Sequence, residues 1–208
     1  GYSFGLSSDE VTATRQPFDT ARTDADGKAE LSLAAFEPPV TTRPLSAELQ
    51  LRIVDASGKP VERTKDLPVA GSNQRIGVKP RSDGSVPEGS EAGFDVVALD
   101  AAGERIAASG LEWQLKKVRV DFQWYQSSGS WNYEPVKTAS RVASGTLDVG
   151  QSEPAALSLP VEWGEYELSV VDPSGAAVPA SLSFEAGWYV SATSLDTPDV
   201  AQVSLDKP

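Results

Sequence analysis

Three glutamates that lie close together in the sequence are the first candidates for chemistry. Glu162, Glu165 and Glu167 fall within six residues. Glycoside hydrolysis uses two carboxyl groups on either side of a cleft. On an extended strand Glu165 and Glu167 would point to the same side, about 7 Å apart. No neighbouring segment indicates a cleft, so we interpret these side chains as the solvated face of a strand.

A second candidate is a calcium loop that would begin at Asp24. Asp24-Ala25-Asp26-Gly27 resembles the first positions of such a loop, but Lys28, Ala29 and Ala35 occupy later positions that require an oxygen ligand, a glycine and a glutamate. We therefore predict a turn here and no metal site.

Nucleophilic catalysis lacks its usual partners. The 208 residues include no His and no Cys, which removes a histidine base for Ser127, Ser128 or Ser130 and excludes a thiolate nucleophile. We predict that the chain is not an enzyme, with no catalytic residues and no cofactors.

The charge balance excludes further classes of partner. With 18 basic and 30 acidic residues the net charge is −12, and nucleic acids and anionic membranes both attract basic surfaces. We expect no nucleic-acid partner and no membrane contact by this segment. Lys116, Lys117 and Arg119 form a local basic cluster, which we interpret as a solvated strand edge where lysines discourage edge pairing.

Aromatic side chains give the alternative function. Trp124, Tyr125, Trp131 and Tyr133 flank one short loop. Sugar-binding sandwiches stack such rings on pyranose faces, so a carbohydrate-binding module is the alternative hypothesis. Against it, strand alternation would place Trp113 and Trp124 in the core, and cross-strand aromatic pairs would only stabilise a hairpin. The candidates for an exposed contact are Tyr125, Trp131, Asn132 and Tyr133.

The elements that would position these side chains are strands. Helical spacing is absent, and 15 Pro and 17 Gly interrupt the chain. The clearest hairpin lies within residues 163–188, where apolar and polar residues alternate on both sides of a turn at Asp172–Gly175. We predict that its apolar residues are buried together: Tyr166, Leu168, Val170, Leu182 and Phe184.

Similar alternation predicts many more strands. A Gly- and Pro-rich stretch, residues 79–93, indicates either a domain boundary near residue 76 or a long loop at the start of a second unit. Short strands separated by turns are typical of antiparallel, immunoglobulin-like β-sandwiches. Further strands are expected at residues 2–5, 28–33, 47–53, 61–65, 94–99, 111–115, 118–125, 131–133, 141–149 and 155–161.

With these residues laid out, the chain resembles the middle of bacterial alpha-2-macroglobulins. The similarity covers nearly all of the chain, and its marks are structural and carry no chemistry. They include Tyr2–Leu6, Thr23–Ala29, Pro44–Ala47, Ser57–Val61, Arg75–Pro80, Leu111–Leu115, Trp124-Tyr125, Trp131–Tyr133, Ser144-Gly145, Trp163–Tyr166, Ala186–Trp188 and Thr197–Asp199.

The resemblance implies an all-β architecture of two tandem macroglobulin-like antiparallel β-sandwich domains. Residues 1–75 would be part of the fifth macroglobulin-like domain and lack its first strands, residues 76–190 would be the sixth, and residues 191–208 would lead into a following domain. Many family members carry a Cys–Gln thioester, which this Cys-free chain cannot contain.

The resemblance also implies a function. The segment would be a non-catalytic structural scaffold of a broad-spectrum protease inhibitor that traps proteases by conformational change after bait cleavage. Its partners would be the neighbouring domains of the same parent chain and, through the whole molecule, target proteases. The expected location is extracytoplasmic and periplasmic, with a lipid-anchored parent.

Overall fold

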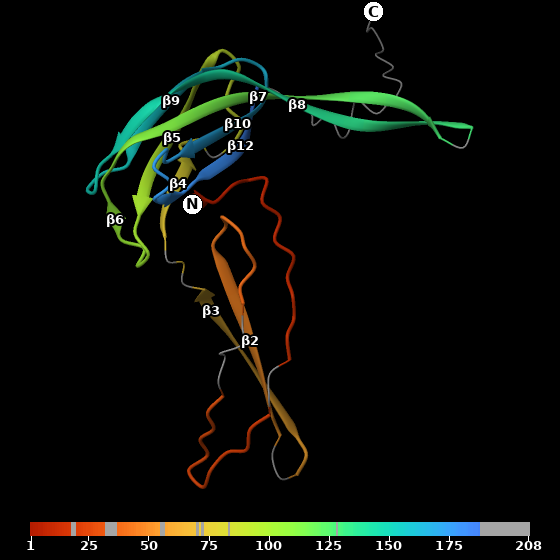
Figure 1. Cartoon of the computed structure of the whole chain (residues 1–208), viewed down its shortest axis with the longest axis vertical. Coiled ribbons are helices and arrows are strands. Elements are labelled where there is room, and N and C mark those ends of the chain that lie inside the picture. Colours follow the sequence, from red (N-terminus) through yellow and green to blue (C-terminus); the bar gives the residue numbers. More distant parts are fainter. Residues whose placement is uncertain are drawn as a thin grey trace, which may run out of the picture.

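Every element of regular structure in the described part of the chain is a β-strand (Figure 1). The structure is a computed structural model that describes residues 1–17, 20–31, 37–54, 57–69, 71, 73–82, 84–127 and 129–187. Within these ranges there is no helix long and apolar enough to cross a membrane. The all-β fold class predicted from the sequence is confirmed.

Two sheets form a sandwich. The first has the order β1–β4–β5–β6, with β11 added to β4 and β9 added to β5, and the second has the order β12–β10–β7–β8. The first sheet consists of β1 (Ser3–Phe4), β4 (Gln74–Pro80), β5 (Ser90–Leu99), β6 (Arg105–Ile106), β9 (Ala155–Val161) and β11 (Ala177–Val178). The second sheet consists of β7 (Ala108–Ser127), β8 (Ser130–Val149), β10 (Gly164–Val171) and β12 (Ala180–Ala186).

The Gly- and Pro-rich stretch is a loop inside this sandwich. It connects β4 to β5, which pair antiparallel from Arg75↔Leu99 to Pro80↔Phe94. The Arg81 amide donates to the Gly93 carbonyl over 2.9 Å, and the Arg81 guanidinium forms an ion pair with Asp95 over 2.7 Å. Residues 81–89 of this stretch form the loop between β4 and β5, and the domain boundary near residue 76 stays a prediction.

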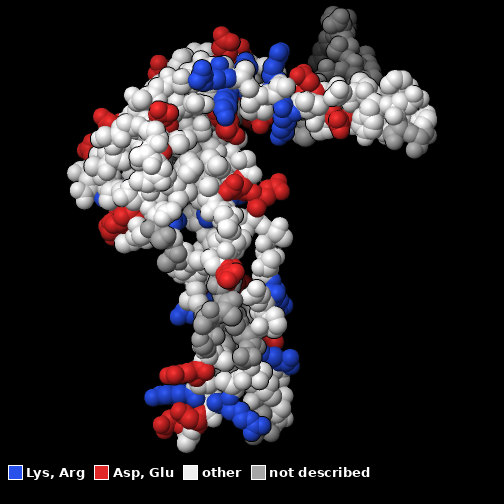
Figure 2. Space-filling model, in the orientation of Figure 1, with Lys and Arg blue, Asp and Glu red and all other residues white. Residues whose placement is uncertain are grey.

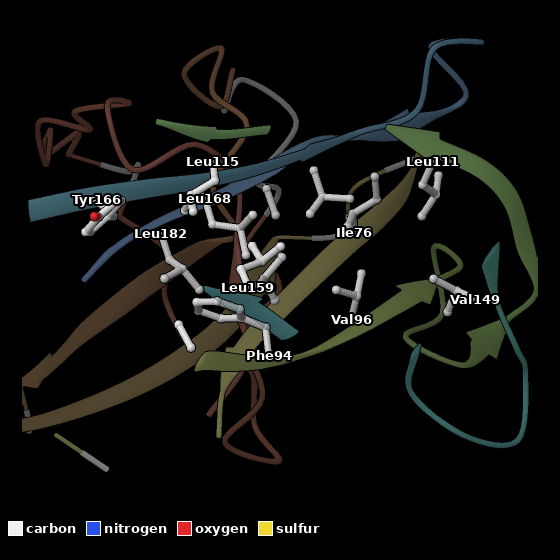
Figure 3. Packing of buried hydrophobic residues seen from close by; sticks show 14 of the residues in the cluster. Ile76, Phe94, Val96, Leu111, Leu115, Val149, Leu159, Tyr166, Leu168 and Leu182 are labelled. Carbon is white, nitrogen blue, oxygen red and sulfur yellow. The ribbon is translucent and has the colours of Figure 1, made fainter. Parts of the chain in front are cut away.

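Apolar side chains from both sheets fill the space between them (Figure 3). Ile76, Phe94, Leu115 and Leu168 are at most 1% exposed, and removing such side chains from water is the main force that holds sandwich sheets together. The alternation of the strands explains the arrangement, since every second residue of β5 and β10 points inward.

The predicted hairpin is β10–β12, and its five apolar residues do meet. Tyr166, Leu168, Val170 and Leu182 are buried, and Phe184 packs against the same core. The Tyr166 and Phe184 rings stack with centroids 5.5 Å apart. Asp172 begins the predicted turn: its Oδ1 accepts from the Ser174 amide over 2.9 Å, and Gly175 follows with φ 74°.

The first residues of the chain complete the edge of the first sheet. β1 pairs antiparallel with β4, with Ser3 opposite Val78 and Phe4 opposite Gly77. Val97 of β5 lies opposite Gly77 on the other side. Phe4 therefore covers the outer surface of the sheet, which explains why Val97 is 2% exposed although the residues on either side of it face the core.

Asp9 ties this N-terminal arm to the residues before β2. Its Oδ2 accepts from the Thr42 amide and hydroxyl, both over 2.7 Å, and from the Thr41 hydroxyl over 3.1 Å. These hydrogen bonds, the Thr42 amide foremost, hold the pKa of Asp9 below its ordinary value because they favour the carboxylate. The Ser7 amide donates to the buried Ser181 hydroxyl over 2.8 Å.

A separate two-stranded sheet lies beyond the arm. It pairs β2 (Leu45–Val54) with β3 (Pro60–Val69) from Leu45↔Val69 to Val54↔Pro60. One of its faces combines apolar residues with Arg63 and Lys65, and its Leu51, Ile53 and Val61 are 36%, 55% and 45% exposed. No second sheet pairs with β2 or β3 in the ranges that the structure describes. That residues 1–75 lack the first strands of a sandwich stays a prediction.

Two expectations about strands were wrong and others cannot be compared. Lys28–Leu31 is not a strand, and no described strand pairs with it. The strands expected at residues 111–115 and 118–125 are one continuous β7, and those expected at 131–133 and 141–149 are one β8. Predicted features outside the described residues are the end of the 28–33 strand, Trp188 and the lead-in 191–208.

Candidate functional site

The aromatic residues singled out in the sequence lie on a long ribbon formed by β7 and β8. The two strands pair from Ala108↔Val149 to Ser127↔Ser130, whereas β10 accompanies β7 only as far as Val118. Beyond Val118 the ribbon projects from the sandwich (Figure 1), and no other strand of the described residues pairs with it there. Gly129, with φ 81°, lies in the predicted loop at its tip.

The ribbon has two different faces. Leu111 and Leu115 of β7 point into the sandwich core, so the odd-numbered residues of β7 continue the core side of the sheet and the even-numbered ones point away from it. We call the even-numbered residues of β7 from Lys116 to Gln126, with the β8 residues opposite them, the outer face of the ribbon. The inner face comprises the odd-numbered residues from Lys117 to Tyr125 and their β8 partners.

The aromatic cluster occupies the outer face. Trp124 lies directly opposite Tyr133, and Trp131 lies opposite Gln126. The Tyr133 ring contacts Phe122 at a centroid distance of 5.6 Å and Trp124 at 5.5 Å. Such cross-strand pairs stabilise a ribbon that has no sheet beside it. Trp124 is 50% and Trp131 67% exposed, so these two rings also present surface to solvent.

The structure divides the predicted contact residues between the two faces. Trp131 and Tyr133 are on the outer face, and Tyr125 and Asn132 form a directly opposed pair on the inner face. One flat ligand cannot stack on all four. A carbohydrate contact stays an untested prediction. Trp113 packs against the core as expected, whereas the placement of Trp124 in the core was wrong.

Two of the three residues of the basic cluster, Lys116 and Lys117, do not lie on a strand edge, which corrects the sequence interpretation for them; Arg119 follows the last β7 residue that pairs with β10 and lies on the edge of β7. Lys116 and Lys117 pair with β10 on one side and β8 on the other, so this part of β7 is interior to the sheet. Lys117 points to the inner side, where its Nζ lies 5.6 Å from the centre of the Tyr166 ring. Lys116 points to the outer side, directly opposite Arg141 of β8.

The outer face contains cations that the sequence analysis missed. Lys137 is opposite Val120, and Arg141 is opposite Lys116, so Lys116, Lys137 and Arg141 share this face. The carboxylates of the ribbon, Asp121 and Glu134, are on the inner face. The signal was present in the sequence as a change of phase, since apolar residues of β7 are odd-numbered up to Leu115 and even-numbered from Val118.

The three glutamates form no carboxylate pair across a cleft. Glu165 and Glu167 lie on the outer side of β10, opposite Val118 and Lys116 of β7. The Ser7 hydroxyl donates to Glu167 Oε2 over 3.4 Å. Glu162 precedes the strand, and its carbonyl accepts from the Tyr166 hydroxyl over 3.1 Å. Their contacts are those of a polar strand face.

The Asp24 segment is a turn, as predicted. Asp24 Oδ1 accepts from the amides of Asp26, over 3.0 Å, and Lys28, over 2.8 Å. The carboxylate thus holds the backbone in an Asx turn. In the ranges that the structure describes, no group of acidic residues is arranged to hold a metal ion.

Comparison with known proteins identifies the family of this chain. The family model of bacterial macroglobulin domain 6 matches residues 77–188, and that of the bacterial alpha-2-macroglobulin MG5 domain matches residues 1–70. The chain belongs to the bacterial alpha-2-macroglobulin family. The predicted resemblance to the fifth and sixth macroglobulin-like domains is confirmed.

Relatives from the same family align along nearly the whole chain. The alpha-2-macroglobulin of Xylella fastidiosa is 29% identical over an alignment of 190 residues, which covers 88% of this chain and 11% of that protein. The Escherichia coli K12 alpha-2-macroglobulin is 28% identical over 228 residues and covers 100% of this chain and 14% of its own length. The chain thus spans about a seventh or less of the length of these alpha-2-macroglobulins.

Solved alpha-2-macroglobulin structures share the fold. Salmonella alpha-2-macroglobulin reacted with methylamine superposes with a TM-score of 0.69 at 27% identity and covers 90% of this chain and 13% of that one. Escherichia coli alpha-2-macroglobulin activated by porcine elastase gives a TM-score of 0.65 at 29% identity, over 91% of this chain and 17% of that one.

The residues that marked the alpha-2-macroglobulin resemblance have packing roles. A Cβ on Gly187 would lie 2.7 Å from Cδ1 of Trp163, and Gly187 has φ 86°, so only glycine fits beside this indole without strain. A Cβ on Gly145 would lie 2.8 Å from Cζ2 of Trp113. In this alpha-2-macroglobulin segment the two tryptophans each lie against a glycine, and the motifs specify the sandwich.

Proposed function

We propose that the chain is a non-catalytic scaffold segment of a bacterial alpha-2-macroglobulin, a protease inhibitor that encloses its target. The observation that carries this proposal is the order of the two family matches, with the fifth domain followed by the sixth along one chain. In a longer protein the segment would hold neighbouring domains in place while cleavage of a bait segment elsewhere triggers a conformational change around the protease.

The junction between the two units supports a structural role. β1 lies in the part matched by the fifth-domain model but pairs with β4 of the sandwich. The arm is fixed a second time by the hydrogen bonds of Asp9 with Thr41 and Thr42. A junction held by a strand pair and a side-chain clamp restricts relative motion of the units, which a segment that transmits a conformational change requires.

The proposed partners follow from the same role. They are the adjoining domains of the longer chain and, through the complete molecule, target proteases. One related Escherichia coli alpha-2-macroglobulin is described as activated by porcine elastase and another as activated by trypsin. We place the protein outside the cytoplasm, in the periplasm of a bacterium, with a lipid anchor on the parent.

Substrate size provides the test. An enclosed protease should lose activity on a large protein substrate and keep activity on a small peptide, because only the small one diffuses to its active site. The longer protein that carries this chain should produce this pattern with elastase or trypsin. The 208-residue chain alone should reduce cleavage of neither the large nor the small substrate. Potent inhibition by the isolated chain would overturn the proposal.

A variant pair tests the scaffold role more directly. In the longer protein, Phe4→Ala removes the ring that covers Val97 at the junction and should reduce enclosure of the protease several-fold while bait cleavage continues. Glu10→Ala changes an exposed residue of the same arm and is the matched control. Equal enclosure by both variants would contradict a mechanical role for the junction.

A further inference from the structure

We propose that the outer face of the β7–β8 ribbon docks onto a neighbouring domain of the same longer chain, at an apolar patch bordered by carboxylates. This inference rests on the proposed function, because a scaffold segment has covalently linked neighbours. It goes beyond that function by naming the surface and the chemistry of the contact.

The first argument is the distribution of charge on the ribbon. On β7 and β8 the outer face contains Lys116, Lys137 and Arg141 and no carboxylate, and Glu165 and Glu167 of β10 border it only at its base, beside Val118 and Lys116. The inner face balances Lys117 and Arg119 with Asp121 and Glu134. The whole chain has a net charge of −12, so a face with only cations stands apart from the rest. Figure 2 shows Lys and Arg side chains, with Asp and Glu side chains among them, where the ribbon leaves the sandwich, and neither charge at the tip of the ribbon on the face in view.

The second argument is that, among the described residues, the cations of the outer face form no ion pair. Lys116 and Arg141 are directly opposite each other, and like charges in such positions destabilise a strand pair. Glu167 is the carboxylate across from Lys116 on β10. In the described part of the chain, however, no ion pair joins Lys116, Lys137 or Arg141 to a carboxylate. Carboxylates from a docked surface would relieve this repulsion.

The third argument is the exposed aromatic surface between the cations and the tip. Trp124 and Trp131 are 50% and 67% exposed on the same face. Large aromatic rings grouped on a surface mark interaction sites, and Trp is among the residues that contribute most to binding. Charged residues around an apolar centre are the usual arrangement of an interface.

The size of the face favours a tethered partner over a free one. Eleven residues of β7 at about 3.4 Å each, in a ribbon of two strands, present roughly 350 Å² on one side. A stable complex of two free proteins buries about 800 Å² on each partner. The outer face alone is too small for a second copy of the chain, but a domain linked covalently needs less area because the link supplies a high effective concentration.

Hydroxyl-radical footprinting of the longer protein tests the proposal at single side chains. Oxidation at each aromatic residue is divided by its intrinsic reactivity. On exposure alone, Trp124 and Trp131 should be oxidised at least as readily as Tyr125, which is 45% exposed on the inner face. Docking predicts the reverse order, with Trp124 and Trp131 protected several-fold relative to Tyr125.

A charge-reversal pair supplies the matched control. Lys137→Glu on the outer face and Arg119→Glu on the inner face make the same change of charge at exposed positions of one ribbon. Docking onto carboxylates predicts that Lys137→Glu restores oxidation of Trp124 and Trp131 and that Arg119→Glu leaves them protected. Restoration by both variants alike, or by neither, would overturn the charge complementarity.

The remaining outcomes all count against the inference. Protection that disappears on dilution would indicate a second copy of the protein, and protection that appears only when a soluble glycan is added would indicate a carbohydrate site. Oxidation of Trp124 and Trp131 that follows their exposure would show a free ribbon. If the protein still encloses a protease in that case, the docking inference fails while the proposed function stands.

Discussion

Gly77→Ala tests whether Phe4 fixes the N-terminal arm to the sandwich. A Cβ added at Gly77 would lie 2.6 Å from Cε1 and 2.9 Å from Cζ of Phe4, and 3.0 Å from Cγ2 of Val97. Gly77 is held in β4 between two strands, so the ring on the two-residue β1 must move. Overpacking costs about 1–3 kcal/mol, and replacing a strand glycine by alanine returns about 0.5–1 kcal/mol. We expect a net loss of up to about 2.5 kcal/mol in the free energy of unfolding.

A double-mutant cycle gives this prediction its control. Urea unfolding followed by tryptophan fluorescence should show the loss in the wild-type background. In the Phe4→Ala background, Gly77→Ala should be neutral or slightly stabilising, since Val97 Cγ2 is then the nearest remaining atom, at 3.0 Å. The gain from replacing a strand glycine cancels in the cycle, which should therefore yield a coupling equal to the overpacking cost, about 1–3 kcal/mol. An equal loss in both backgrounds would refute the argument that Phe4 is the group displaced.

Two further predictions concern the core and the arm. Leu168→Ala, at a fully buried position, should lower the free energy of unfolding by about 2–5 kcal/mol. Val171→Ala, at 40% exposure on the same strand, should lower it by less than about 1 kcal/mol. Comparable losses for the two variants in denaturant titrations would contradict the assignment of inward and outward faces. For Asp9 the folded pKa lies below 3.8, so the clamp is intact above that pH and is lost as the pH falls through the folded pKa. Hydrogen exchange at the amide of Thr42 should accelerate relative to its intrinsic rate in that acid range, and Asp9→Asn should remove this pH dependence. If the acceleration persists in Asp9→Asn, another titrating group causes it.

The β10–β12 hairpin shows what the sequence could predict. Its alternation of apolar and polar residues agrees with the faces of a strand pair, and the Asp172–Gly175 turn agrees with their register. Local pattern and packing point the same way there, so the buried set was predictable down to Phe184. The family resemblance was also predictable, because the packing of Trp113 on Gly145 and of Trp163 on Gly187 requires these residue types at fixed positions in the sequence.

The β7–β8 ribbon shows what the sequence could not predict by alternation. Apolar residues change from odd to even positions after Leu115, and a change of phase suggests that one strand ends and another begins. In the structure the strand continues and the apolar residues move to the other side of the sheet, because the core ends near Lys117. The pairing of β1 with β4 joins residues about 75 positions apart and leaves no local signal.

The length of the ribbon beyond the sandwich has a mechanical consequence. The nine residues of β7 after Val118 extend about 30 Å at the usual rise of a strand. A rigid tilt of the sandwich by roughly 10° would therefore carry the tip about 5 Å, which is the spacing of neighbouring strands. The ribbon would then work as a lever arm: a rotation too small to disturb the packing of the sheets would become, at Trp131, a shift of about one strand spacing.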